Sequence, residues 1–128
     1  MIELIVAAIL ATTARQPCDT AAECQANLEP YVEFVFQDHP YVTPDEAWSV
    51  IMCESSGKPS AKNPHSTAGG VFQYLEGTWH GEAHYFGWTL TDPVHRFDPV
   101  LAVKLTYLVT ERDAITRGNP FVQWECQP

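Results

Sequence analysis

Apolar residues recur mostly at helical spacing along the chain. Residues 19–38 read as a helix that is broken or restarted at Pro30, because proline removes a backbone donor. Residues 43–54 and 99–117 carry long apolar stripes, and the second is apolar nearly all round, as expected of a buried central helix. Residues 71–79 read as a shorter helix. No stretch alternates convincingly as a strand, so the pattern predicts a mostly α-helical fold.

Capping residues mark the ends of these helices. Thr43, Pro44 and Glu46 together form a capping-box signature with proline at the first helical position. Gly57 is the expected C-cap of the same helix. Asp98, directly before a proline, is the expected N-cap of the last helix.

The middle of the chain is irregular. Residues 60–70 form a turn-rich loop, and residues 80–97 are rich in aromatic side chains without helical periodicity. With 128 residues the chain fits one domain. We therefore expect a small single-domain helical fold whose middle segment is irregular or holds a short hairpin, with a helical extension at 17–42 preceding the main unit at 43–128.

The N-terminal segment, residues 1–16, is read as a signal peptide. Residues 4–11 are apolar throughout and end in small residues, which is typical of a signal core and its cleavage site. Glu3 stands where a signal peptide carries a positive charge, so the alternative is an apolar N-terminal helix packed on the domain. The signal interpretation predicts a secreted, periplasmic or cell-wall-associated protein, or one carried by a phage.

Overall charge narrows the range of partners. The formal net charge is −9, and 45% of the residues are hydrophobic while 18% are charged. This is ordinary globular composition. Nucleic acid is excluded as an expected partner because phosphate binding requires a basic surface, and a strongly anionic membrane surface is disfavoured for the same reason.

The four cysteines are expected to form disulfides. Three pairings are possible; one of them joins Cys18 to Cys24 and Cys53 to Cys126. On the chain-entropy model the long loop contributes roughly 4 kcal/mol and the short one roughly 2 kcal/mol. A zinc site built from the same cysteines is the alternative, but the chain has no CxxC pair.

Glu54 is the candidate catalytic residue. Ala47, Val50, Ile51 and Glu54 lie at positions i, i+3, i+4 and i+7, which form one helix face. A carboxylate at such a position is desolvated, and both burial and the helix C-terminus raise its pKa. A carboxyl group that keeps its proton near neutral pH can act as a general acid. The alternative is that Glu54 lies on a solvated rim.

An ordered set of motifs follows Glu54. They are Glu54-Ser55, Asn63-Pro64, Ser66-Thr67-Ala68-Gly69, Gly70-Val71-Phe72-Gln73 and Thr78-Trp79. This set resembles the signature of the lysozyme-like superfamily, which includes soluble lytic transglycosylases, goose-type lysozymes and resuscitation-promoting factors. The strong resemblance covers residues 44–79. The cysteine before Glu54 and the Trp-x-Cys ending at 124–126 are similar to one branch of that group, which favours Cys53 bonded to Cys126.

The resemblance implies an α+β lysozyme-like fold and cleavage of the β-1,4 bond between N-acetylmuramic acid and N-acetylglucosamine in peptidoglycan. Glu54 matches the catalytic acid, and no cofactor, metal or oligomer is implied. Tyr74 and Tyr107 are candidates for stabilising an oxocarbenium-like centre. The expected substrate-binding residues are Ser55, Ser66, Gly70, Gln73, Tyr74, Thr78, Trp79 and Tyr107.

A second carboxylate is not identified by spacing. Two-carboxylate glycosidases need one, whereas lytic transglycosylases use a single acid and the 6-hydroxyl of the substrate to form a 1,6-anhydro product. Glu76, Glu82 and Asp92 are candidates. The Ala-Tyr-Asn motif of many lytic transglycosylases is not visible near the C-terminus, so hydrolysis and transglycosylation both stay open.

Other features have ordinary interpretations. His80 and His84 flank Glu82, but the order HGEAH differs from the zinc motif HExxH, so we expect surface or cleft histidines. Aromatic residues could stack on sugars or lie in the core; these are Trp79, Tyr85, Phe86, Trp88 and Trp124. The alternative function is a non-catalytic glycan-binding or virion-structural module of the same fold.

Overall fold

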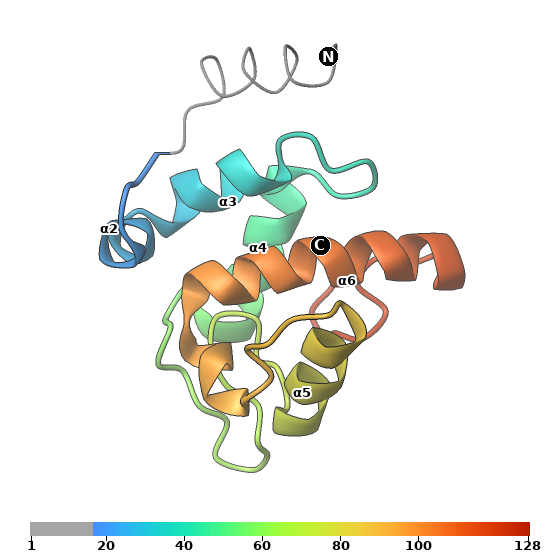
Figure 1. Ribbon diagram of the computed structural model, residues 1–128. Helices are drawn as coiled ribbons and strands as arrows, with labels where there is room; N and C mark the ends of the chain where they lie inside the picture. The colour runs from blue at the N-terminus through green and yellow to red at the C-terminus, as the bar shows by residue number, and fades with distance from the viewer. Residues whose placement is uncertain (1–16) are drawn as a thin grey trace.

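Helices carry most of the described chain, which is residues 17–128 of a computed structural model (Figure 1). In chain order they are α2 (Ala21–Ala26), α3 (Leu28–Phe36), α4 (Pro44–Ser55), α5 (Glu76–Tyr85), the 3-10 helix η1 (Pro93–Phe97) and α6 (Pro99–Arg117). The prediction of a small, mostly helical domain is confirmed. The predicted signal peptide at 1–16 lies outside the described residues.

Helix α6 lies at the centre of the fold. Figure 1 shows it crossing the molecule between α3 on one side and α5 on the other. Ala102, Val103, Leu105 and Val109 are fully buried on it. Lys104 and the last turn are exposed, with Ile115 at 65% of its accessible surface, so the helix is central as predicted but has one solvent-facing side and an exposed end.

One hydrophobic core joins the helices into a single unit. Helix α3 packs against both α4 and α6, and α5 packs against α6 and η1. Aromatic rings fill the space between them; the largest fully buried ones are Trp79, Tyr31, Phe36, Phe72 and Phe121. The region predicted as an N-terminal extension therefore contributes side chains to the same core as the rest of the chain.

The predicted helix starts are confirmed by their hydrogen bonds. The Thr43 hydroxyl accepts from the Glu46 amide at 3.2 Å, while the Thr43 amide donates to the Glu46 carboxylate at 3.0 Å. Asp98 accepts from the amides of Val100 and Leu101 at the start of α6. These caps satisfy amide donors that have no partner within the helix.

Two helix boundaries differ from the prediction. The break expected at Pro30 occurs at Asn27, and Pro30 lies in the first turn of α3, where a missing amide donor costs no intrahelical bond. Helix α4 ends with Ser56, not Gly57, as its left-handed C-cap (φ 55°). Gly57 follows at φ 77°, and its amide donates to the Ser55 hydroxyl at 3.1 Å. The C-cap of α4 is therefore one residue earlier than expected.

The short helix expected at residues 71–79 also begins later than predicted. The first part of the helix expected at 71–79 is a turn, and α5 spans Glu76–Tyr85, so it begins inside the predicted helix and continues into the region expected to be irregular. Gln73 adopts a left-handed backbone (φ 54°), which interrupts any helix through this position. Gly69 forms isolated antiparallel bridges with Lys62 and Tyr74, so the expected hairpin is present only as these two bridges.

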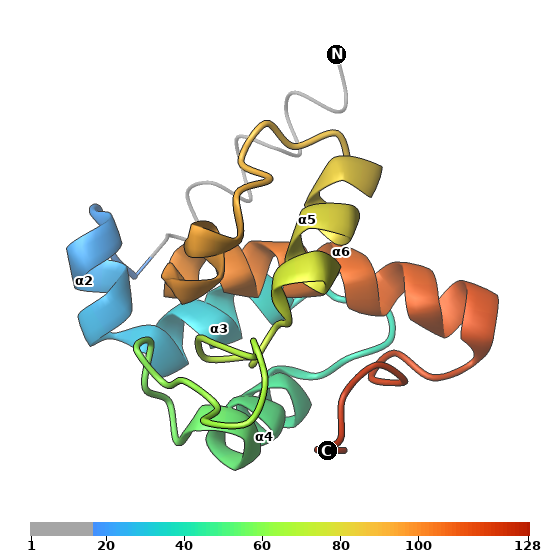
Figure 2. The same ribbon diagram turned by 90° about the horizontal axis from the view of Figure 1, so that it is seen from below.

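Both expected disulfides are present. Cys18, which precedes α2, is bonded to Cys24 on α2, and Cys53 on α4 is bonded to Cys126. Figure 2 shows the C-terminal segment turning back from the end of α6 toward α4, as the second disulfide requires. Among residues 17–128, no helix is both long and apolar enough to cross a membrane.

Candidate active site

A cavity of about 340 Å³ opens beside the C-terminal end of α4. Its volume falls within the range of roughly 300–1,000 Å³ that is usual for small-molecule sites. The end of α4, the 63–68 loop, the turn at 73–78 and the C-terminal segment form its walls. Several residues predicted for the site line this cavity: Glu54, Ser66, Gln73, Tyr74 and Thr78.

Glu54 stands at the border between the core and the cavity. Ala47, Val50 and Ile51 are fully buried, as the predicted stripe requires. The next buried position is Ser55, which lies four residues after Ile51. Glu54, beside it, is half-buried and lines the cavity, so the carboxylate lies next to the apolar stripe rather than within it.

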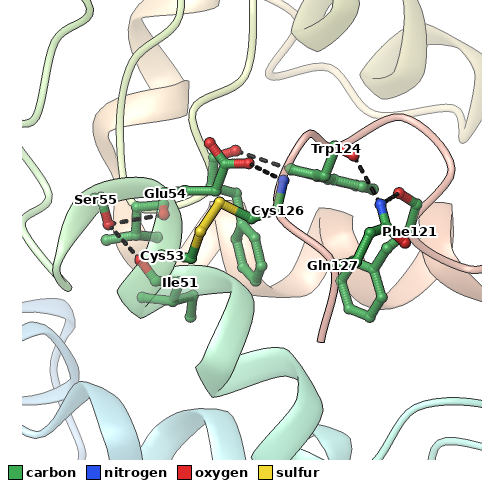
Figure 3. The surroundings of a disulfide bond; sticks show 10 residues. Ile51, Cys53, Glu54, Ser55, Phe121, Trp124, Cys126 and Gln127 are labelled. Carbon is green, nitrogen blue, oxygen red and sulfur yellow. Dashed lines mark hydrogen bonds between the residues drawn. A yellow bond between two sulfur atoms is a disulfide. The ribbon is translucent and has the colours of Figure 1, made fainter.

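The surroundings of Glu54 favour its protonated form. Burial raises the pKa of the Glu54 carboxyl group, and the charge of Glu125 raises it further. One hydrogen bond acts in the opposite direction: the Cys126 amide donates to Glu54 Oε2 at 3.3 Å (Figure 3). The net direction is upward, which is the shift that a general acid needs.

Ser55 bonds the loop that follows α4 and does not line the cavity. Its hydroxyl donates toward the Ile51 carbonyl at 3.0 Å (Figure 3). It also lies 2.8 Å from the Val71 carbonyl, and it accepts from the Gly57 amide. These contacts join the end of α4 to the turn that precedes α5. Ser55 is not among the cavity-lining residues.

Aromatic residues form a fixed base beneath the cavity. The rings of Tyr74 and Trp124 meet edge to face with centroids 5.7 Å apart. Trp124 Nε1 donates to the Phe72 carbonyl at 2.9 Å. The Tyr74 hydroxyl lies 2.8 Å from Thr106 Oγ1, and since Thr106 donates its own proton to a carbonyl on α6, Tyr74 is the donor. The phenol is therefore bonded to α6 and not to Glu54.

Gln73 presents a fixed amide to the cavity. Its Nε2 donates to the Gly70 carbonyl at 2.8 Å and to the Ala61 carbonyl at 3.2 Å. Both bonds use the nitrogen, so they set the plane and direction of the side-chain amide. The left-handed backbone of Gln73 is rare for a residue with a side chain, and the two bonds help to hold it.

Gly70, which was expected to bind substrate, instead packs against η1 together with Gly69. A Cβ at Gly70 would lie 2.0 Å from the Arg96 carbonyl oxygen, and one at Gly69 would lie 2.6 Å from the Phe97 ring. Gly70 also has φ 81°, a conformation that side chains rarely adopt. Gly70 does not line the cavity; its role in this structure is to let the loop approach η1.

Two predicted aromatic residues lie elsewhere. Trp79 is fully buried, with Nε1 donating to the Leu90 carbonyl at 3.2 Å, so its ring offers no face to a ligand. Tyr107 packs against His39, with ring centroids 4.5 Å apart, and against Phe36. Neither lines the cavity.

The three suggested second carboxylates are engaged away from the cavity. Glu82 pairs with Arg112. Glu76 lies 3.7 Å from a guanidinium nitrogen of Arg96, and Asp92 accepts from the Val94 amide. None of the three lines the cavity.

Trp124, one of the aromatic residues named as able to stack on sugars, also lines the cavity, and several lining residues were not predicted for the site: Asn63, His65, Ala68, Leu75, Gln123 and Glu125. The most informative is Glu125, because it places a second carboxylate in the cavity. Its signal in the sequence was the neighbouring Cys126, since a bond from that cysteine to Cys53 necessarily brings Glu125 close to Glu54.

The histidine pair belongs to α5 despite the glycine between its members. The rings of His80 and His84 stack with centroids 6.5 Å apart, and His80 Nδ1 lies 3.3 Å from the Thr91 carbonyl. Within residues 17–128, no group of three or more side chains of His, Cys, Asp or Glu is arranged to hold a metal ion.

Comparisons with protein-family models, with curated proteins and with solved structures found no match. The likeness to lysozyme-like enzymes therefore rests on the motif at residues 44–79. The motif contributes Glu54, Ser66, Gln73 and Thr78 to the cavity wall. Its glycines and Trp79 stabilise the surrounding fold.

Proposed function

We propose that the chain is a peptidoglycan-cleaving glycosidase of lysozyme-like fold that uses Glu54 as its general acid. The observation that carries this proposal is the setting of Glu54. Its carboxyl group is half-buried, has a raised pKa and lines a cavity of about 340 Å³ at the end of a helix. A protonated carboxyl group at such a position can give its proton to a departing sugar oxygen.

The rest of the cavity suits a sugar chain. The side-chain amide of Gln73 and the hydroxyls of Ser66 and Thr78 offer hydrogen-bonding groups. The exposed side chain of Leu75 offers apolar surface to the faces of sugar rings, and the buried ring of Trp124 supports the cavity beneath it. The substrate implied by the motif is the bond between N-acetylmuramic acid and N-acetylglucosamine, and Glu54 acts on the oxygen of that bond.

The disulfides support an oxidising compartment as the place of action. Both cysteine pairs are bonded, and such bonds persist mainly in secreted or periplasmic proteins. Peptidoglycan lies in the same compartments, so the proposed location and the proposed substrate agree.

The test is digestion of purified peptidoglycan by the wild type and by Glu54→Gln. The variant keeps the size of the side chain and removes the proton, so we expect turnover to fall by about 100-fold or more, as is typical for loss of a general acid. Mass analysis of the released muropeptides measures turnover. Glu33→Gln makes the same change at an exposed position on α3, away from the cavity, and should digest at the wild-type rate.

Three outcomes separate the alternatives. Wild-type turnover in Glu54→Gln contradicts the proposal. Peptidoglycan binding by the wild type without any new product favours the non-catalytic module. A product lighter by one water than the hydrolytic product identifies a lytic transglycosylase, because that route closes the 1,6-anhydro ring.

A further inference from the structure

The C-terminal segment holds one residue of the cavity in place from both sides. Trp124 is anchored by its buried ring and by its bond to the Phe72 carbonyl. Cys126 is anchored by its disulfide to Cys53. Glu125 lies between these two anchors, so its backbone is fixed at the mouth of the cavity although its side chain is exposed.

The same anchors bring Glu125 close to Glu54. The Cys126 amide nitrogen is 3.3 Å from Glu54 Oε2. Two covalent bonds separate that nitrogen from the Glu125 Cα, which therefore lies within about 6 Å of the Glu54 carboxylate. In inverting glycosidases the two carboxyl groups are ~6.5–9.5 Å apart, with a water between them. A glutamate side chain rooted at the Glu125 Cα can reach that separation.

The two side chains have contrasting environments. Glu54 is half-buried and Glu125 is exposed. The charge of Glu125 also contributes to the raised pKa of Glu54. When the surroundings of two neighbouring carboxyl groups differ in this way, one serves as acid and the other as base. Among the cavity-lining residues of the described chain, these two are the carboxylates.

We propose that Glu125 is the second catalytic carboxylate of this cavity and acts as the base that deprotonates the attacking water. The inference rests on the proposed glycosidase function and makes the reaction a hydrolysis. Glu125 fits the role of second carboxylate better than Glu76, Glu82 and Asp92, because the side chains of those three make their contacts outside the cavity.

Each carboxyl group moves one proton in this reaction. Glu54 gives its proton to the glycosidic oxygen as the bond between that oxygen and the anomeric carbon breaks. Glu125 takes a proton from the water whose oxygen bonds to the anomeric carbon from the opposite face. The product is a hemiacetal of inverted, α configuration, and exchange with solvent returns both carboxyl groups to their starting states.

The test compares Glu125→Gln with wild type on purified peptidoglycan. We expect kcat to fall by about 100-fold with little change in KM, because the base acts on water and not on substrate binding. Sodium azide should restore turnover, since azide needs no base, and it should yield an α-glycosyl azide. The thermal unfolding midpoint should stay at the wild-type value because the side chain is exposed.

The outcomes distinguish this inference from the function on which it rests. Wild-type turnover in Glu125→Gln, no rescue by azide, or a wild-type product that is only the 1,6-anhydro sugar overturns the role of Glu125 and leaves that of Glu54 intact. Wild-type turnover in Glu54→Gln overturns both. Loss of turnover in Glu125→Gln, rescue as the α-azide and an α hemiacetal from the wild type support the inference.

Discussion

Two adjacent residues at the end of α4 have opposite roles. Ser55 is buried and its hydroxyl is satisfied by backbone groups on either side, so it stabilises the fold. Glu54 is only half-buried and accepts one bond, from the Cys126 amide. The ionised form of Glu54 is therefore under-solvated, and the protein is less stable for having it.

Glu54→Gln should raise the thermal unfolding midpoint at pH 7. The pKa of Glu54 is higher in the folded state than in the unfolded chain, so the folded state binds the proton more tightly. Stability from this group is present below about pH 4.5 and is lost as the pH rises through the folded-state pKa. The glutamine variant escapes this loss, and its advantage should disappear on acidification.

Thermal unfolding followed by circular dichroism from pH 3 to pH 8 measures the effect. Glu33→Gln, which removes a charge from an exposed position, is the matched control and should show no such pH-dependent gain. A wild type that is more stable than Glu54→Gln at pH 7 contradicts the raised pKa.

At the scale of elements, the start of α4 sets the direction of the helix that carries Glu54. The reciprocal bonds of Thr43 and Glu46 satisfy two backbone amides at this end. Thr43→Ala should cost about 1 kcal/mol of the free energy of unfolding. The expected fall in the unfolding midpoint is about 4 °C.

Urea unfolding of Thr43→Ala checks this value. Thr116→Ala is the control, because the Thr116 hydroxyl bonds only a carbonyl of its own helix at an exposed position. Equal losses in the two variants would mean that the capping box contributes nothing specific.

Local features of the fold were predictable and long-range ones were not. The caps at Thr43 and Asp98 depend on residues two or three positions away, so the sequence shows both partners. The left-handed Gln73 depends on contacts with Ala61 and on the bridge between Gly69 and Tyr74. No periodicity reports such contacts, so a helix was predicted where a turn forms.

The residues of the candidate site show the same difference between local and long-range features. Glu54 was predicted because helical spacing and the motif both point to it, although the buried stripe itself continues through Ser55. Tyr107 was selected by chemistry alone, and the packing of α6 against His39 directs it elsewhere. Glu125 was overlooked because only the bond between Cys53 and Cys126 places it in the cavity.

At the scale of the whole molecule, charge is unevenly distributed along the chain. Residues 17–57 contain eight acidic residues and no lysine or arginine, whereas residues 58–128 contain seven acidic and six basic residues. Most of the cavity wall comes from the second, nearly neutral part. The cavity lining itself includes the carboxylates of Glu54 and Glu125 and no lysine or arginine, so binding of an anionic cell-wall polymer must depend on short-range contacts rather than on electrostatic attraction.

The two disulfides should differ in their effect on the fold. Removing the bond between Cys53 and Cys126, which are 73 residues apart, by the double change to serine should cost about 4 kcal/mol. The same change at Cys18 and Cys24, which are 6 residues apart, should cost about 2 kcal/mol. The short bond closes a smaller loop in the unfolded chain, so it removes less entropy.

Activity should separate the two variants more strongly than stability does. The long disulfide holds the amide that binds Glu54 and the segment that forms one cavity wall, so its loss should lower turnover of peptidoglycan. The short disulfide lies beside α2 and touches neither. Digestion assays below both unfolding midpoints make the comparison, and equal turnover in the two variants would exclude a role for the long disulfide in the site.

The long disulfide also bears on when the cavity wall is completed. Glu54 and the amide that binds it are 72 residues apart, so a growing chain finishes α4 long before it can complete the cavity wall. The disulfide then ties this wall to α4, and such bonds form and persist mainly in oxidising compartments. With the proposed export, the disulfide that completes the cavity wall would thus form only in the compartment in which the proposed substrate lies.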